Sequence, residues 1–268
     1  GTILPIDYLR QMVSDAVAMP AQENIVKRLN FCLWTEQSVR WLRMDMWDKC
    51  GQKFDVESLR GRKCYGGLDL AKVNDLSALA LLFPPVEEGE LIKILMFYWV
   101  PDEDVTTRSL RDSVPYDVWM REGLITATEG NVTDFDYIKR DIINLAGIYD
   151  IQDIAYDRTF AGELVQGLLA ENIQMVEMGQ GFMSMGAPTA ELERMVKGQK
   201  FTHGGHPVLR WNASNVSVST NAAGDIKPDK EKSTERIDGL VALVMSVDRN
   251  MRNEITTSIY DQRGIITT

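Results

Sequence analysis

The sequence predicts an α/β protein with a mixed sheet, in which an antiparallel meander is followed by parallel strands and the sheet is flanked by helices. Two apolar runs, at 65–70 and 76–83, are joined by a short polar connection that suits neighbouring antiparallel strands. A third apolar run, at 91–100, follows a turn rich in proline, glutamate and glycine. Helix and strand patterns then alternate over 133–176, as is typical of parallel strands joined by crossover helices.

The first sixty residues are expected to be helical and distinct from the rest of the chain. Apolar residues recur three and four apart over 6–17, which is the pattern of an amphipathic helix. A segment with three tryptophans at 34–47 favours packing in a core or an interface. Gly61 then ends this region, so we predict a boundary between residues 61 and 62.

The elements after the meander are predicted from the same patterns, up to a polar tail at 253–268. We expect a short strand at 124–128, a helix from Thr133 as its N-cap to Ala146, a strand at 153–158, a helix at 164–169 and a strand at 173–176. We then expect a glycine-rich loop at 179–187, a helix at 188–197, a helical segment and a strand within 207–219, a polar connection at 221–232 and a helix within 233–250 capped by Ser233 or Thr234.

Composition and charge exclude several classes of protein. The chain has 268 residues, of which 44% are hydrophobic and 25% charged, as in ordinary globular domains. Its net charge of −10 argues against a broad basic face for nucleic acid, so any grip on DNA has to be local or shared. The sequence contains neither a signal peptide nor a run of about 20 apolar residues, so we expect a soluble, intracellular protein.

Cysteine and histidine give weak signals. Cys32, Cys50 and Cys64 have no ligand spacing, so free thiols are expected rather than disulfides or a zinc site. His203 and His206 form an HxxH pair that could bind a metal, but no cysteine or acid set lies nearby and loop geometry is favoured.

Three acids occupy places that converge in a ribonuclease H-like sheet. Asp69 lies at the end of the first strand, Asp157 ends the first strand after a helix, and Asp238 lies at the start of the last helix. Clustered carboxylates repel one another unless divalent cations neutralise them. Oxygen ligands suit Mg²⁺ or Mn²⁺, and two such ions about 3.5–4 Å apart can activate a water and stabilise a leaving oxygen. The set therefore predicts metal-assisted hydrolysis of a phosphodiester.

Between Cys64 and Arg249 the sequence resembles the large terminase subunits of tailed bacteriophages, in their carboxy-terminal nuclease domain. The blocks that carry the resemblance are, in order, YGGLDLAKVNDLSAL, IAYDR, GFMSMGAPTAELERMV, HGGHPVLRWNASNV and KPDKEKSTERIDGLVALVMSVDR. The resemblance implies a ribonuclease H-like endonuclease that cleaves concatemeric double-stranded viral DNA during genome packaging. The family's metal-binding acids match Asp69, Asp157 and Asp238, and an accessory acid matches Asp75.

In this interpretation each acid has its own role. Asp69 would bridge two Mg²⁺ or Mn²⁺ ions, while Asp157 and Asp238 would each complete the coordination of one. Asp75 would support the site from its edge. Candidates for contacts with the DNA backbone are Lys227, Lys230 and Lys232.

The resemblance also implies an organisation and partners. Family terminases carry an amino-terminal ATPase, but this chain has no GxxxxGK[ST] motif. We therefore expect residues 1–61 to be a helical linker or the tail of that missing ATPase half, 62–252 the nuclease domain and 253–268 a carboxy-terminal tail. Expected partners are DNA, the ATPase half, the portal and the small terminase subunit, with no membrane. The expected location is the host cytoplasm and not the mature virion.

Two other functions stay open at this point. An actin-like ATPase fold also begins with an acid-bearing strand and a hairpin, although its second glycine-rich phosphate segment is not apparent here. A non-catalytic docking module of the packaging motor would explain the acidity and the tryptophan segment.

Overall fold

The structure is a computed structural model that describes residues 5–18, 26, 30–31, 41–71, 76–103, 105, 109, 114–157, 159 and 162–256. The chain divides into two compact units, residues 1–41 and 42–268. Helix α1 (Ile6–Ala18) belongs to the first unit and confirms the predicted amphipathic helix. The second unit already begins at Leu42, before the boundary predicted at residue 61, and its early residues Trp47 and Leu59 are buried.

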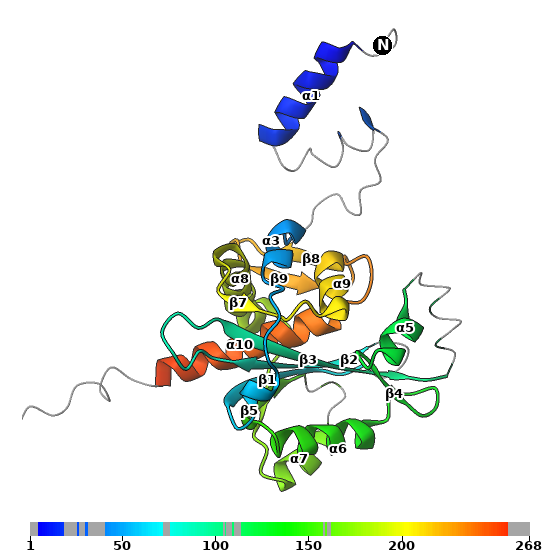
Figure 1. The fold of residues 1–268 in the computed structure, drawn as a ribbon, viewed down its shortest axis with the longest axis vertical. Helices are drawn as coiled ribbons and strands as arrows, with labels where there is room; N and C mark the ends of the chain where they lie inside the picture. The colour runs from blue at the N-terminus through cyan, green and yellow to red at the C-terminus, as the bar shows by residue number, and fades with distance from the viewer. Residues whose placement is uncertain are drawn as a thin grey trace, which may run out of the picture. The chain divides into compact units, whose positions relative to one another are not determined.

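The second unit is built on a seven-stranded mixed sheet with the order β4-β3-β2-β1-β5-β6, and β7 also pairs with β3 (Figure 1). Strands β1, β2 and β3 are antiparallel neighbours, and β5 and β6 continue the sheet in parallel from β1. The predicted meander followed by parallel strands is therefore confirmed. The strands are β1 (Lys63–Asp69), β2 (Ser77–Phe83), β3 (Ile92–Pro101), β4 (Thr126–Thr128), β5 (Asp150–Tyr156), β6 (Met175–Glu177) and β7 (Phe201–Thr202).

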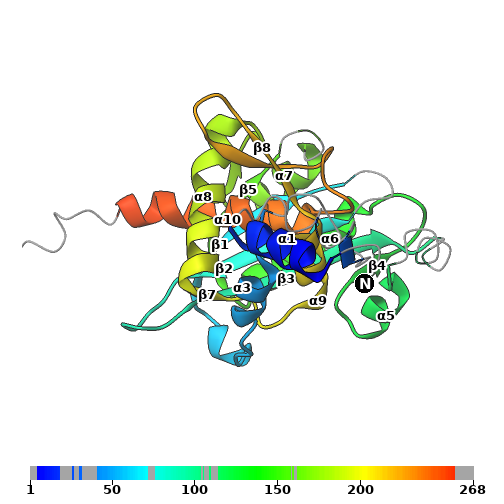
Figure 2. The same ribbon diagram turned by 90° about the horizontal axis from the view of Figure 1, so that it is seen from above.

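Helices cover both faces of this sheet. Helices α6 and α7 pack on one face, and α10 crosses β1, β2 and β5 on the other, together with α8, α9 and the small β8-β9 sheet (Figures 1 and 2). The further elements are α3 (Met44–Lys49), the 3₁₀ turn η1 (Glu57–Leu59), α5 (Tyr116–Arg121), α6 (Phe135–Ala146), α7 (Gly162–Ala170), α8 (Phe182–Gly198), α9 (Pro207–Asn215), β8 (Ser217–Thr220), β9 (Ile226–Asp229) and α10 (Asp238–Thr256).

Strand β1 lies in the middle of the sheet, and its residues are buried after Lys63. Side chains alternate between the two faces of a strand. Cys64 and Leu68 pack into the core on the α6 and α7 side, so Gly67 and Asp69 face α10. A Cβ atom at Gly67 would lie 2.1 Å from the carbonyl oxygen of Ala242 in α10. Glycine is required here because the two backbones touch.

The start of α6 differs in detail from the prediction. Its N-cap is Asp134, whose Oδ1 accepts a hydrogen bond from the backbone N–H of Tyr137 at 3.0 Å. The prediction of Thr133 was wrong because both residue types can cap a helix and only the backbone path decides between them.

Two segments predicted as irregular are ordered by tertiary packing. Six of the nine residues of the predicted loop at 179–187 form the first turns of α8, where Met185 is buried. The polar connection at 221–232 contains β9, which pairs with β8. Neither segment has an apolar periodicity of its own, so neither was predicted from the sequence.

Helix α10 begins at Asp238, later than predicted. The Ser233 hydroxyl does not cap it, and donates instead to the carbonyl oxygen of Asp229 at 2.6 Å. The same hydroxyl accepts a hydrogen bond from the backbone N–H of Ser217 at 3.0 Å. Ser233 thus closes the β8-β9 hairpin. The predicted helix itself is confirmed and continues to Thr256, and residues 257–268 of the predicted tail lie outside the described residues.

Cys50 and Cys64 are buried free thiols, as predicted, and Cys32 lies outside the described residues. His203 stacks on Trp47 with ring centroids 4.8 Å apart, and its Nε2 lies 3.1 Å from the Trp47 carbonyl oxygen. His206 packs against Tyr98. The two histidines therefore pack on aromatic side chains, with His203 buried and His206 partly exposed, in agreement with the predicted loop geometry.

The first prediction concerns the contact between β1 and α10. Gly67→Ala is expected to lower the free energy of unfolding by about 2–3 kcal/mol, because the added methyl group meets helix backbone that cannot move aside. Urea denaturation measures this loss. In the control Gly162→Ala, no described atom lies within 4 Å of the added Cβ, so stability should hold or rise. Equal stability of the two variants would contradict the close contact.

The second prediction concerns His206. Burial, and then the neighbouring His203, lower its pKa to about 4, whereas the unfolded chain has a pKa of about 6.5. Because the folded state binds fewer protons than the unfolded state, His206 contributes about 3 kcal/mol to the free energy of unfolding above pH 6.5. This contribution is lost as the pH falls towards 4. His206→Gln should flatten the pH dependence of the unfolding free energy between these values, as measured by urea denaturation. If the unfolding free energy of His206→Gln depends on pH as steeply as that of the wild type, the role of His206 is refuted.

Candidate active site

A lysine bridges two buried carboxylates at one end of the sheet. The Nζ atom of Lys230 lies 2.7 Å from Asp69 Oδ2 and 2.9 Å from Asp238 Oδ1. Asp69 is 2% exposed and Asp238 is 4% exposed. Gln180 Nε2 donates a second hydrogen bond to Asp69, to its Oδ1 at 3.1 Å. Two of the three predicted acids therefore meet.

The two acids meet because strand and helix periodicities match where β1 touches α10. Asp69 is two residues after Gly67, on the same face of β1, and Asp238 is one helical turn before Ala242. Two strand residues span about 6.6 Å and one helical turn about 5.4 Å. Both carboxylates consequently emerge at the same end of the contact.

The partners of Asp69 come from two distant segments. Lys230 follows directly after β9, and Gln180 lies just before α8. A cavity of about 320 Å³ opens beside them, lined by Gln180, Met185, the segment 227–231 and Val241. The hairpin and the start of α8 thus form the wall of the site.

Asp157 lies at the end of the neighbouring strand. In the parallel register Leu68 of β1 pairs with Tyr156 of β5, so Asp69 and Asp157 follow at adjacent positions of strands about 4.8 Å apart. Asp157 Oδ1 accepts a hydrogen bond from the backbone N–H of Thr159 at 2.8 Å. Within the described part of the chain, no three His, Cys, Asp or Glu side chains are grouped to hold a metal ion. The assignment of Asp157 as a ligand therefore stays a prediction.

The other predicted residues have different surroundings. Asp75 lies outside the described residues. Lys227 Nζ lies 5.6 Å from the centroid of the Phe182 ring, and Lys232 Nζ donates to Ser219 Oγ at 2.9 Å. Of the three lysines predicted to contact DNA, only Lys230 bonds to the acids.

The electrostatics of the site depend on burial. Burial raises the pKa of Asp69 to about 6; Lys230 opposes this shift, whereas the charge of Asp238 adds to it. Burial lowers the pKa of the Lys230 ammonium. The charges of Asp69 and Asp238 and their hydrogen bonds raise it by more, so the pKa of Lys230 lies above its usual value. Lys230 is therefore a permanent cation.

The donor set fits a divalent cation. Asp238 Oδ2 is buried, and no described group hydrogen-bonds to it. A buried carboxylate oxygen without a partner is unfavourable, which leaves a coordination position open. Asp69 and Asp238 offer the oxygen ligands that Mg²⁺ and Mn²⁺ prefer.

Further side chains hold the start of α10 in position. Asn212 is fully buried, and its Nδ2 donates to the carbonyl oxygen of Arg236 at 2.8 Å. The Tyr98 hydroxyl donates to Asn212 Oδ1 at 3.0 Å. Asn212 and Gln180 were not predicted from the sequence, where the only signal for either is a polar residue beside apolar or glycine neighbours.

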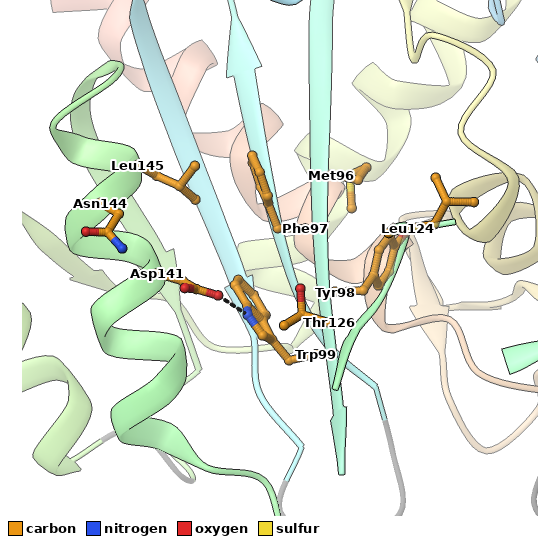
Figure 3. A pocket seen from close by; sticks show the side chains of 10 residues that line it. Met96, Phe97, Tyr98, Trp99, Leu124, Thr126, Asp141, Asn144 and Leu145 are labelled. Atoms are coloured by element: carbon orange, nitrogen blue, oxygen red, sulfur yellow. Dashed lines mark hydrogen bonds between the residues drawn. The ribbon is translucent and has the colours of Figure 1, made fainter. Parts of the chain in front are cut away.

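A second cavity, of about 250 Å³, lies between β3, the segment leading into β4, and α6 (Figure 3). Its side chains are mostly apolar, and Trp99 Nε1 donates to Asp141 Oδ2 at 2.8 Å within it. None of the described residues that line it binds a predicted acid, whereas Gln180 and Lys230, which bind Asp69, line the 320 Å³ cavity. The chemistry of the chain is therefore expected at the Asp69 end.

The strand order and the buried acids at the end of β1 and the start of α10 define a ribonuclease H-like α/β protein. A family model described as "Terminase large subunit, endonuclease domain" matches residues 1–254. The chain belongs to this family, which confirms the resemblance found in the sequence.

Individual proteins agree with this assignment. The large subunit of the terminase of Enterobacteria phage HK97 is 34% identical over 249 residues, which are 92% of this chain and 48% of the relative. The crystal structure of the HK97 large terminase matches with a TM-score of 0.72 at 34% identity, over 93% of this chain and 51% of that chain. The large terminase nuclease of the thermophilic phage G20c shares the fold, with a TM-score of 0.50 at 12% identity, over 76% of this chain and 94% of that chain.

The chain thus spans about half the length of the HK97 terminase. Among the described residues, no helix combines the length and the apolar character that crossing a membrane requires.

The third prediction tests the support of Asp238. Asn212→Ala is expected to lower the free energy of unfolding by about 2–3 kcal/mol, because it removes one buried and one partly buried hydrogen bond. Tyr98→Phe removes only one of them and should cost about 1 kcal/mol. Chemical denaturation compares the two variants, and a larger loss for Tyr98→Phe would count against Asn212 as the anchor.

Proposed function

We propose that this chain is the nuclease part of a terminase large subunit, a metal-dependent endonuclease that cleaves concatemeric double-stranded viral DNA during genome packaging. The main support is the meeting of the buried Asp69 and Asp238 at the end of a ribonuclease H-like sheet. The terminase endonuclease family gives this pair of acids its chemical context.

The proposed cofactor is Mg²⁺ or Mn²⁺, bound as two ions. Asp69 would bridge the ions, with Asp157 and Asp238 each completing the coordination of one, and Asp75 would support the site. Divalent ions held by these acids would supply Lewis acidity and a water of lowered pKa as the nucleophile for phosphodiester hydrolysis.

The side chains of this protein prepare the site for that chemistry. Asp69 and Asp238 are held at fixed positions by β1 and α10, and Gln180 orients Asp69 through its amide. Because both acids are buried, water competes little for their oxygens, and their charges act in a medium of low dielectric constant. The orientation of the acids therefore costs nothing at the moment of reaction.

The substrate would reach the acids along the wall formed by the hairpin and the start of α8. The 320 Å³ cavity opens there, and Lys227 and Lys230 line it. With a net charge of −10, the chain is expected to hold DNA weakly by itself. The amino-terminal ATPase half, the portal and the small terminase subunit are the proposed partners, in the host cytoplasm.

The fourth prediction tests this function. Supercoiled plasmid should be nicked and linearised with Mn²⁺ or Mg²⁺, and excess EDTA should stop the cleavage. Asp69→Ala, Asp157→Ala and Asp238→Ala should each lower the cleavage rate at least about 100-fold, because each removes a proposed ligand. Asp136→Ala, at a side chain 88% exposed in α6, is the control and should cut normally.

Unchanged cleavage by Asp69→Ala or Asp238→Ala would refute the proposed active site. Unchanged cleavage by Asp157→Ala would refute only the assignment of Asp157 as a metal ligand. Failure of the wild type to cut with either metal, together with binding to the ATPase half, would favour the docking function.

A further inference from the structure

We propose that Lys230 is an internal counter-ion that occupies the cation position between Asp69 and Asp238 in the metal-free protein, and that a divalent cation binds there by displacing it. This inference rests on the proposed function, since it assumes that these acids are metal ligands. It assigns Lys230 the role of setting the metal affinity of the site, in place of the predicted contact with DNA.

The geometry is that of one cation shared by two ligands. A single ammonium lies within 3 Å of an oxygen of each acid, at 2.7 Å from Asp69 and 2.9 Å from Asp238. A metal ion that joined the two acids would have to contact these two oxygens or the second oxygen of the same carboxylates. Lys230 and a bridging ion therefore compete for one place.

The acids are fixed and the lysine can leave. The side chains of Asp69 and Asp238 are 3% and 6% exposed, whereas the Lys230 side chain is 43% exposed. Lys230 belongs to the short segment between β9 and α10 and lines the 320 Å³ cavity. A lysine has a long flexible stem, so its ammonium can move into that cavity without a change in the backbone.

The charges favour exchange. The two ionised carboxylates carry a charge of −2, and the single ammonium neutralises only half of it. Asp238 Oδ2 is buried and lacks a hydrogen bond from any described group. A divalent cation would neutralise the pair completely and could use the oxygen that the ammonium leaves without a partner. Lys230 therefore stabilises the metal-free fold but opposes metal binding.

The fifth prediction separates this role from that of a permanent structural ion pair. Calorimetric titration with Mn²⁺ at pH 8, without DNA, should give Lys230→Met an affinity about tenfold higher than that of the wild type, because two charge-assisted hydrogen bonds no longer compete. Lys230→Arg retains the cation and should stay close to the wild type. Lys197→Met, which removes the same charge from a side chain 70% exposed on α8, is the matched control and should not change the affinity.

Thermal unfolding gives a second readout that does not depend on activity. In EDTA, Lys230→Met should unfold at a lower temperature than the wild type, because two buried carboxylates are left without a cation. Saturating Mn²⁺ should close most of this difference, since the ion then replaces the ammonium in both proteins. A difference that Mn²⁺ leaves unchanged would identify Lys230 as a structural residue and overturn the proposal.

The outcomes distinguish this inference from the proposed function. Loss of the binding heat in Asp238→Asn assigns that heat to this site. If the wild type binds Mn²⁺ and Lys230→Met binds it equally or more weakly, the counter-ion role is refuted while the metal site stands. If the wild type, Lys230→Met and Lys230→Arg all fail to bind Mn²⁺, the proposed function fails and the counter-ion role fails with it.

Discussion

The site depends on one close contact, between the backbone of β1 at Gly67 and the backbone of α10 at Ala242 and Ser246. A side chain at position 67 would hold the helix away from the sheet. Asp238, one turn before Ala242, would then move away from Asp69. Because β1 is covered on both faces and paired on both edges, its end is fixed. The helix is therefore the element whose position decides whether the two acids meet.

The second constraint is electrostatic. Two carboxylates buried side by side are unfavourable unless a positive charge lies between them. That charge comes from Lys230, 161 residues away from Asp69 in the sequence, and the amide of Gln180 adds a hydrogen bond from 111 residues away. The β8-β9 hairpin and the start of α8 are consequently parts of the site.

The chain corresponds to about half of the HK97 large terminase, and its fold agrees with that structure over nearly its whole length. Its strong negative charge is unusual for a protein that is proposed to act on DNA. This charge supports the expectation that the chain holds DNA only weakly by itself. The nuclease part would then need only a local path to its acids, such as the cavity beside Lys230.

The sequence alone determined most of the strands and helices in their order, the antiparallel start of the sheet, the family and the strand end at which Asp69 lies, whereas β7, β9 and the start of α10 at Asp238 were not predicted. The predicted features are local properties, because hydrophobic periodicity and ordered motifs are read along the chain. Only the tertiary structure decided which groups surround the acids. Lys230 stood in a polar connection, Gln180 in an expected loop and Asn212 in a short helix without a spacing signal. Their bonds to Asp69 and Tyr98 join residues more than 100 positions apart. Such contacts depend on how α10, α9 and the hairpin pack on the sheet, and no local pattern encodes that packing.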